Sequence, residues 1–206
     1  MITIVDYGMG NLRSVSKGFE RVGAKTSVTQ DGKAIASASK LVLPGVGAFQ
    51  NAVRNLEELR LTEPLLEFLK TGQPFLGICL GLQLLFTESE EGEPTRGFDL
   101  FKGRVRRFPN SALKVPHIGW NRVKVSSRNG SQKAPPLLEG IPDDSYFYFV
   151  HSYYVDPDDV SCVAARTDYG LPFTSMIWKD NIFATQFHPE KSQELGLRVL
   201  ENFARL

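Results

Sequence analysis

The sequence predicts an α/β fold with a mostly parallel central sheet, flanking helices and additional antiparallel strands in the second half. Two observations carry this prediction. In the first half, short apolar runs alternate with segments whose apolar residues recur at helical spacing, which is typical of parallel strands joined by helices. In the second half, short strand-like runs follow one another. The 206 residues can bury a substantial core, and we treat 1–206 as a single domain.

The first elements follow in order from the N-terminus. Residues 2–5 form an apolar strand that ends at the turn Asp6–Gly10. Asn11 caps a helix that ends at Gly23, because asparagine accepts hydrogen bonds at helix starts and glycine favours helix ends. The apolar positions of this helix recur at helical spacing: Leu12, Val15, Phe19 and Val22.

The remaining elements continue this alternation and then become mainly strands. Residues 40–43 form a strand, Thr62 caps a helix that ends at Gly72, residues 74–78 form a strand, and residues 82–86 start a helix. Ser192 caps the last helix. Later strands are expected at residues 104–108, 146–150, 161–166, 174–178 and 182–187, and an exposed loop at 128–136.

A cysteine lies at the turn between the strand at 74–78 and the following helix, in the segment Gly77–Gly81. Hydrolases hold their nucleophile on such a turn, where a strained backbone projects the side chain and glycines avoid collisions. A helix N-terminus also favours thiolate over thiol. The alternative is a packed core cysteine, which is the commoner role of this residue. We assign that role to Cys162, in a short apolar strand, and the nucleophile role to Cys79.

A histidine that can serve as the base follows near the C-terminus, in His188–Pro189–Glu190. A cysteine nucleophile needs a base, and the base needs a partner that orients its ring. His188 fits the first role and Glu190 the second. The other two histidines, His117 and His151, have no such carboxylate beside them. The sequence therefore predicts a Cys79–His188–Glu190 triad.

Composition excludes several classes of function. A net charge of +1 gives no reason to expect nucleic acid or a membrane surface as a partner, and no apolar run approaches the roughly 20 residues that span a bilayer. The chain starts directly with a strand, so we expect no signal peptide. Two cysteines suit a reducing cytoplasm. Gly8–Met9–Gly10 is no dinucleotide site, because Arg13 stands where the third glycine belongs, and we expect no cofactor or metal.

Taken together, the cysteine turn and the His188–Pro189–Glu190 segment resemble the class I (triad) glutamine amidotransferases over essentially the whole chain. Within that family, Pro44–Gly47 resembles one branch, the glutaminase subunits of imidazole glycerol phosphate synthase in histidine biosynthesis. Many relatives carry a double glycine there instead. Further stretches agree with this branch: Asp6–Asn11, Pro116–Asn121, Tyr148–Tyr153 and Phe187–Ser192.

The resemblance implies that Cys79 attacks the side-chain amide of glutamine, that His188 passes the proton to the departing ammonia, and that Glu190 holds the ring. The negative oxygen of the intermediate needs preorganised donors. The backbone N–H of Leu80 is one candidate. A second is expected from the strand Gly45, Val46 and Gly47, where glycines permit a peptide rotation.

By the same resemblance, Gln83, Glu91, Ser152 and Tyr153 line the substrate pocket, and Glu91 pairs with the α-ammonium group of glutamine. The simpler interpretation of Gln83 is an exposed helix residue. The simpler interpretation of Glu91 is one more charge in the solvated run 88–93.

The resemblance also implies a partner, a (β/α)8-barrel cyclase subunit that forms a heterodimer with this chain. It would use the ammonia to make imidazole glycerol phosphate and an aminoimidazole carboxamide ribotide by-product. Two alternatives stay open: the glutaminase of pyridoxal phosphate or anthranilate synthase, and a non-catalytic scaffold. The implied interface residues, which are otherwise ordinary sheet or surface residues, are Asn11, Trp120, Tyr146, Tyr148 and Lys191.

Overall fold

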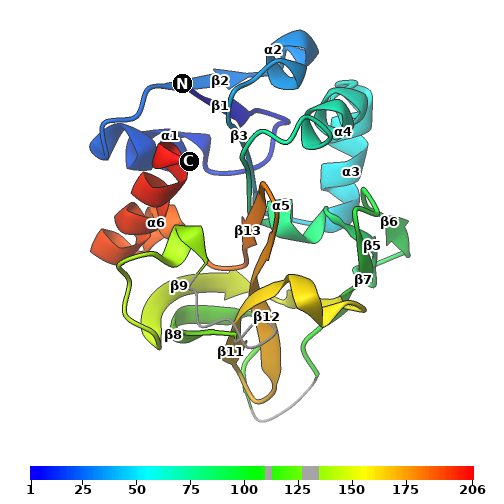
Figure 1. The fold of residues 1–206 in the computed structure, drawn as a ribbon. Helices are drawn as coiled ribbons and strands as arrows, with labels where there is room; N and C mark the ends of the chain where they lie inside the picture. Colours follow the sequence, from blue (N-terminus) through cyan, green and yellow to red (C-terminus); the bar gives the residue numbers. More distant parts are fainter. Residues whose placement is uncertain (110–112, 127–134) are drawn as a thin grey trace.

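The computed structural model describes residues 1–109, 113–126 and 135–206, so most of the loop expected at 128–136 lies outside the described residues. Its centre is a run of parallel strands (Figure 1). Parallel strands place their carboxyl ends at one edge, where sites form in such sheets. In sheet order these strands are β2 (Thr26–Thr29), β1 (Ile2–Val5), β3 (Leu41–Gly45), β4 (Phe75–Cys79) and β13 (Ile182–Thr185).

The second half of the chain extends this sheet with mainly antiparallel pairs, which confirms the predicted fold class. The exception is β5, which pairs with β7 in parallel. β8 and β9 form a hairpin that joins the sheet through β11. These strands are β5 (Phe86–Ser89), β6 (Thr95–Arg96), β7 (Phe101–Arg107), β8 (His117–Val125), β9 (Ser145–His151), β10 (Tyr153–Pro157), β11 (Val163–Asp168) and β12 (Pro172–Lys179).

Helices cover both faces of the parallel strands (Figure 1). The first and last helices, α1 and α6, pack against each other on one face, and α3 and α4 lie on the other. The helices are α1 (Leu12–Arg21), α2 (Gly32–Ala36), α3 (Phe49–Glu58), α4 (Thr62–Leu69), α5 (Leu80–Gln83) and α6 (Gln193–Arg205), with 3₁₀ turns η1 (Pro136–Leu138), η2 (Val160–Cys162) and η3 (Pro189–Lys191).

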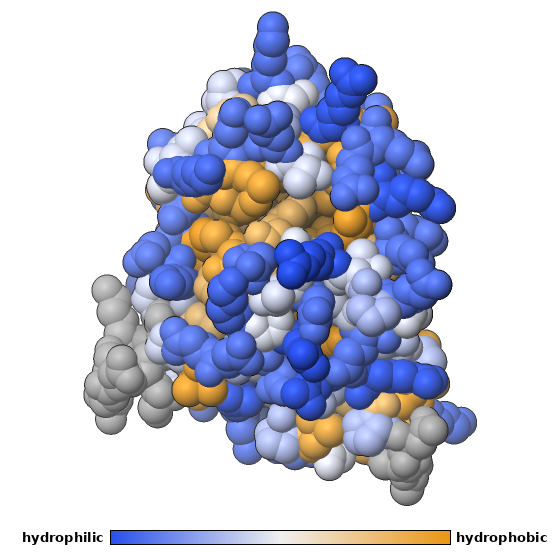
Figure 2. Space-filling view, turned by 90° about the vertical axis from the view of Figure 1, so that its right-hand side faces the viewer, coloured by the Kyte–Doolittle hydropathy of each residue, from blue (hydrophilic) through white to orange (hydrophobic). Residues whose placement is uncertain are grey.

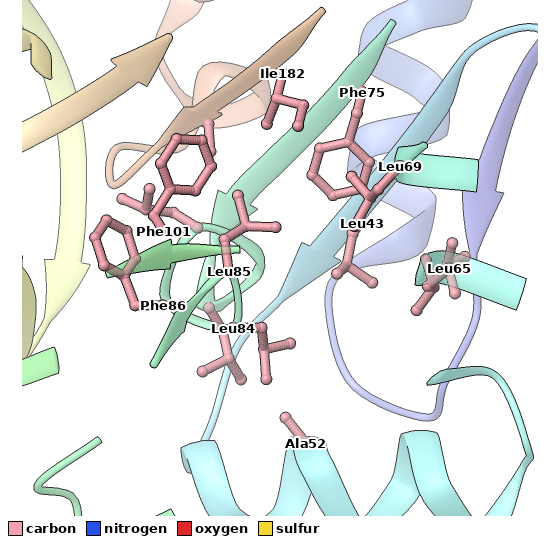
Figure 3. Packing of buried hydrophobic residues seen from close by; sticks show 14 of the residues in the cluster. Leu43, Ala52, Leu65, Leu69, Phe75, Leu84, Leu85, Phe86, Phe101 and Ile182 are labelled. Atoms are coloured by element: carbon pink, nitrogen blue, oxygen red, sulfur yellow. The ribbon is translucent and has the colours of Figure 1, made fainter. Parts of the chain in front are cut away.

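Alternation along the strands divides the core into two clusters. Val42 contributes to the cluster under α1 and α6, and its neighbour Leu43 to the cluster under α3 and α4. Figure 3 shows the second cluster, where Phe75 of β4 and Leu65 of α4 meet side chains from several strands. Figure 2 shows the outside of this half, where apolar residues gather in the upper part of a mostly hydrophilic face.

Several predicted boundaries are confirmed and others are wrong. Asn11 caps α1 through its side chain, which accepts a hydrogen bond from the backbone N–H of Ser14. Thr62 is the first residue of α4 rather than its cap, and the N-cap position is held by Leu61, which makes no side-chain cap hydrogen bond. The helix expected at 82–86 is short, because Phe86 already belongs to β5. Cys162 is buried as predicted, but in a 3₁₀ turn. None of the helices in the described part of the chain has the length and apolar character to cross a membrane.

Candidate active site

Cys79 lies at the end of β4 on a strained turn. Its φ of 55° is in the left-handed region, which residues other than glycine rarely adopt, and α5 begins at the next residue. A Cβ on Gly81 would collide with the carbonyl oxygen of Leu43, and a Cβ on Gly77 would lie 2.8 Å from the carbonyl oxygen of Gly81. Both glycines are therefore required by packing, and they hold a buried cysteine at the sheet edge.

The segment predicted as the oxyanion strand lies beside this cysteine. Gly45, the last residue of β3, is the register partner of Cys79 on β4. A side chain on Gly45 would collide with the hydroxyl of Tyr7 and with Leu80. Gly47 has a φ of 111°, and Val46 between the two glycines is 37% exposed. The structure thus brings the predicted residues Gly45, Val46, Gly47 and Leu80 together around Cys79, with Tyr7, which the sequence indicated only as part of the Asp6–Asn11 motif, as an additional buried neighbour.

His188 and Glu190 form a buried pair at the start of η3. Nδ1 of His188 lies 2.7 Å from Oε1 of Glu190, and both side chains are about 2% exposed. Burial lowers the pKa of His188, but its interactions with Cys79 and the hydrogen bond that its Nδ1 donates to the Glu190 carboxylate outweigh burial and raise this pKa to about 10. Nε2 of His188 makes no hydrogen bond to any described protein atom. The nitrogen not held by Glu190 is therefore available for proton transfer.

Ser192 anchors the histidine loop instead of capping α6 as predicted. Although Ser192 occupies the N-cap position, its side chain makes no cap hydrogen bond. Its hydroxyl donates to the carbonyl oxygen of His188 at 2.7 Å and accepts from the backbone N–H of Tyr148 at 2.9 Å. The backbone N–H of His188 donates to the carbonyl oxygen of Tyr148, also at 2.9 Å. Strand β9 therefore fixes the position of His188, the predicted base.

A cavity of about 390 Å³ opens over Cys79. All four residues predicted to bind substrate contribute to its wall, together with Lys191 of the predicted interface. No group of three or more His, Cys, Asp or Glu in the described ranges is arranged to hold a metal ion. The cavity is lined by Val46, Gly47, Cys79, Leu80, Gln83, Glu91, Pro116, Val150, His151, Ser152, Tyr153 and Lys191.

Two of the predicted substrate residues also hold the cavity wall in place. Oε2 of Glu91 accepts a hydrogen bond from the backbone N–H of Phe49 at 2.8 Å, which ties it to the start of α3. Gln83 is 5% exposed, so it is not the solvent-facing helix residue of the simpler interpretation. Its Nε2 donates to the carbonyl oxygen of Tyr153 and to Oε1 of Gln186. Both side chains therefore lie in the cavity with fixed orientations.

A pair of buried histidines lies at the cavity, with His151 in its lining and His117 next to it, and the sequence indicated both only as parts of family motifs. Nδ1 of His151 lies 2.8 Å from the carbonyl oxygen of Tyr153, and Nε2 lies 3.0 Å from Nδ1 of His117. A carbonyl oxygen only accepts, so His151 carries its proton on Nδ1. Its Nε2 is then the acceptor of a hydrogen bond that Nδ1 of His117 donates. Burial lowers the pKa of His117 to about 4 and that of His151 to about 3. Both rings are neutral at pH 7.

Because His117 and His151 are buried in their neutral forms, we expect the folded protein to lose stability in acid. Their neutral forms stabilise the fold fully above pH 6.5, and this contribution is lost as the pH falls toward the folded-state values, because the unfolded chain binds the protons. Between pH 6.5 and 5 the loss is about 2 kcal/mol for each histidine. His117→Phe keeps the stacking on Tyr169 and Phe149. Its unfolding free energy, measured with urea at pH 7 and pH 5, should fall by about 2 kcal/mol less than that of the wild type. An unchanged difference between the two pH values would contradict this assignment.

Four of the five predicted interface residues lie on the β8–β9 hairpin or against it. The rings of Trp120 and Tyr148 lie 6.1 Å apart, and Nζ of Lys191 lies 5.8 Å from the ring centre of Tyr148. Trp120 and Tyr146 are 44% and 49% exposed and line a second hollow, of about 570 Å³, with the start of α6. Asn11 is exposed too, but it lies at the start of α1, which its side chain caps, rather than on the hairpin.

Comparison with known proteins agrees with this geometry. The sequence profile of the family described as "Glutamine amidotransferase class-I" matches residues 3–206. The chain is similar to the imidazole glycerol phosphate synthase subunit HisH of Syntrophotalea carbinolica, with 54% identity over 98% of both chains. It is also similar to that of Geobacter sulfurreducens, with 51% identity over 100% of this chain and 98% of the relative.

A solved structure, that of PurLQS from Thermotoga maritima, shares the fold with a TM-score of 0.74 at 16% identity, over 99% of this chain and 97% of the other. Identity this low supports the fold alone. The family match and the similarity of more than 50% each span nearly the whole sequence. The chain is therefore a member of the class I glutamine amidotransferase family.

Proposed function

We propose that this chain is the glutaminase subunit of an imidazole glycerol phosphate synthase and that residues 1–206 form one glutaminase domain. It hydrolyses glutamine to glutamate and ammonia for histidine biosynthesis. The observation that carries the choice of synthase is the 54% identity to a subunit of this enzyme over 98% of both chains. The site supports the same chemistry, because Cys79 lines the cavity and His188, whose pKa is raised by Cys79, is paired with the buried carboxylate of Glu190.

The raised pKa of His188, about 10, indicates how the first step proceeds. In the proposed mechanism Cys79 attacks as a thiolate, while His188, which is protonated at pH 7, holds the proton. The sulfur attacks the amide carbon, and the proton on His188 passes to the departing ammonia. Water then attacks the thioester while the neutral ring accepts its proton, which restores the ion pair and releases glutamate. Glu190 keeps the ring oriented through both steps.

The oxygen of the tetrahedral intermediate becomes negative and needs donors beside Cys79. The Leu80 backbone N–H follows the cysteine at the start of α5. The other donor comes from Gly45, which pairs with Cys79 at the end of β3, or from Val46 and Gly47, which follow it and line the same cavity as Cys79. The positive φ of Gly47 and the two glycines allow the intervening peptide to turn its N–H toward the cavity.

The cavity wall suits the α-amino acid part of glutamine. Oε2 of Glu91 is held by Phe49, and the rest of the carboxylate faces a cavity whose lining also holds Ser152 and Tyr153. A carboxylate attracts the α-ammonium group. Ser152, Tyr153 and Gln83 are further polar residues in the lining of this cavity.

The hairpin β8–β9 provides the face for a partner. Trp120 and Tyr146 are exposed aromatic residues, a type enriched at protein interfaces, and Lys191 connects this face with the cavity wall. We propose that a (β/α)8-barrel cyclase subunit binds here, in the cytoplasm, and that Asn11 and Tyr148 belong to the same interface. The partner takes ammonia directly, because ammonia released into neutral water becomes ammonium, which is not a nucleophile.

The test is glutamate formation by the chain alone, by the complex with the cyclase subunit, and by the complex with the phosphorylated ribosyl-aminoimidazole acceptor. The chain alone should be nearly silent, and the full complex about 10²–10³ times faster, the effect of one oxyanion donor. Val46→Pro removes the N–H that the mechanism requires and should lose this stimulation. If the glutaminase activity of this chain is not stimulated by the cyclase subunit, but is stimulated by the partner subunit of another synthase, the choice of synthase is wrong.

A further inference from the structure

Gln186 is a fully buried polar residue that lies against the predicted nucleophile. It follows β13 and is 0% exposed. Its side-chain Nε2 lies 3.5 Å from Sγ of Cys79, within hydrogen-bond distance for sulfur. Its Oε1 accepts from Nε2 of Gln83 at 3.2 Å. A buried amide with partners at both ends is fixed in orientation, so the atom it presents to the sulfur is a property of the fold.

The direction of each hydrogen bond follows from one backbone group. The carbonyl oxygen of Tyr153 only accepts, so the Gln83 atom 3.1 Å from it is the nitrogen. The same nitrogen faces Gln186 and donates there, so the facing atom of Gln186 is its oxygen. The remaining end of Gln186, which faces Cys79, is then the NH₂ group. The donor at the sulfur is therefore set by the chain from Tyr153 through Gln83.

We propose that Gln186 is a further catalytic residue, whose amide N–H hydrogen-bonds the sulfur of Cys79 and stabilises it as a thiolate, and that Gln83 is the positioning residue that aims this amide. The inference rests on the proposed function for its role in turnover. Cys79 is only 6% exposed, so little water is available to solvate a charge on its sulfur. A buried charge needs protein donors in place of water.

The amide complements His188, which cannot stabilise the sulfur throughout the reaction. Once His188 has given its proton to ammonia, the ring is neutral. The thioester carbon then takes the attacking water, and the C–S bond breaks with its electron pair returning to sulfur. The N–H of Gln186 carries no titratable proton, so it remains a donor to that sulfur in every state. This arrangement lowers the cost of both forming and releasing the thiolate.

The alternative is that Gln186 only fills a polar gap between β13 and Gln83. Gln186→Met distinguishes the two, because methionine has a similar volume and no N–H. The full-length protein is treated with iodoacetamide, and alkylation of each cysteine is followed by mass spectrometry. Cys162, whose Sγ lies 3.1 Å from the carbonyl oxygen of Asp159, is the internal reference. Cys79 should react roughly tenfold more slowly in the variant, the effect of one hydrogen bond to a charged group, while Cys162 is unchanged. An unchanged Cys79 rate in the folded variant would overturn the proposal.

Gln186→Glu adds a pH-dependent test. A carboxylate at this position repels the thiolate, whereas the protonated acid donates an O–H in place of the N–H. The Cys79 alkylation rate of this variant, divided by that of the wild type, should therefore rise as the pH falls, while the ratio for Gln186→Met stays flat. A flat ratio for both variants would contradict the donor role. If the buried glutamate prevents folding, the methionine variant decides the question.

Steady-state kinetics with glutamine connects the residue to turnover. In the complex with the cyclase subunit, Gln186→Met should lower kcat by roughly tenfold and leave KM nearly unchanged, because the N–H contacts sulfur rather than substrate. A rise in KM alone would show that Gln186 shapes the pocket instead. The alkylation experiment needs neither glutamine nor a partner, so its result stands even if the proposed function fails.

Discussion

Replacing Cys79 with alanine should abolish glutamine hydrolysis, with a loss of roughly 10⁴–10⁶-fold, the size seen when a catalytic nucleophile is removed. The thiol is the group that forms the covalent intermediate, and no other described cysteine lies in the cavity. The variant should still bind the cyclase subunit. The complex should also still make product from added ammonium salt, because the acceptor chemistry lies in the partner. Glutamate release and ammonia-dependent synthesis are measured side by side.

Cys162→Ala is the matched control. Cys162 is buried like Cys79, but it lies in η2 and bonds its own turn. This variant should keep full glutaminase activity. Wild-type turnover in Cys79→Ala would eliminate the nucleophile assignment. Loss of ammonia-dependent synthesis as well would show that the substitution disturbs the complex rather than the chemistry.

The second large effect is expected at His188. Alanine at this position removes the group that carries the proton to ammonia, and we expect a loss of about 10⁴–10⁶ in kcat. Glu190→Gln should cost less. A glutamine of the same size can still accept the Nδ1 hydrogen bond that Glu190 makes at 2.7 Å, but it cannot balance the charge of the protonated ring. Turnover of both variants is measured in the complex at saturating glutamine.

The double variant separates a shared role from independent ones. If Glu190 acts by orienting and charging His188, the combination of His188→Ala and Glu190→Gln is little slower than His188→Ala alone, because groups that act as a unit are not additive. Losses that multiply would show that Glu190 acts apart from the histidine. The thermal stability of each variant serves as the folding control, since Glu190 is a buried carboxylate.

The sequence predicted those features that depend on neighbouring residues. Gly77 and Gly81 indicate a tight turn at Cys79, and the structure shows the backbone contacts that exclude a side chain at both positions. The cap at Asn11 is equally local. The substrate residues were reached through the resemblance rather than through spacing. They converge in the structure because they line one cavity together with Cys79.

Other features were not predicted, in most cases because they depend on tertiary contacts. Phe86 starts a strand because it pairs with Phe101 of β7, which ends the helix expected at 82–86. Helix α3 is different, because Phe49, Ala52 and Leu56 recur at helical spacing and the sequence therefore does carry the pattern of this unpredicted helix. Gln186 stands in an apolar strand end, and only its distance to a cysteine 107 positions away shows what it contacts.

The hydrogen bonds that join Tyr148 to the loop of His188 also couple the position of His188 to that of β9. Both backbone groups of Tyr148 are used, its oxygen by His188 and its N–H by the hydroxyl of Ser192. Sliding the strand by one residue would break both bonds and turn its outward side chains inward. The register of β9 in the hairpin therefore determines the position of the His188 ring, because Tyr148 of β9 holds the loop that carries it. An insertion or deletion in β9 is therefore expected to move the His188 ring relative to Cys79, as well as to change the exposed face of the hairpin.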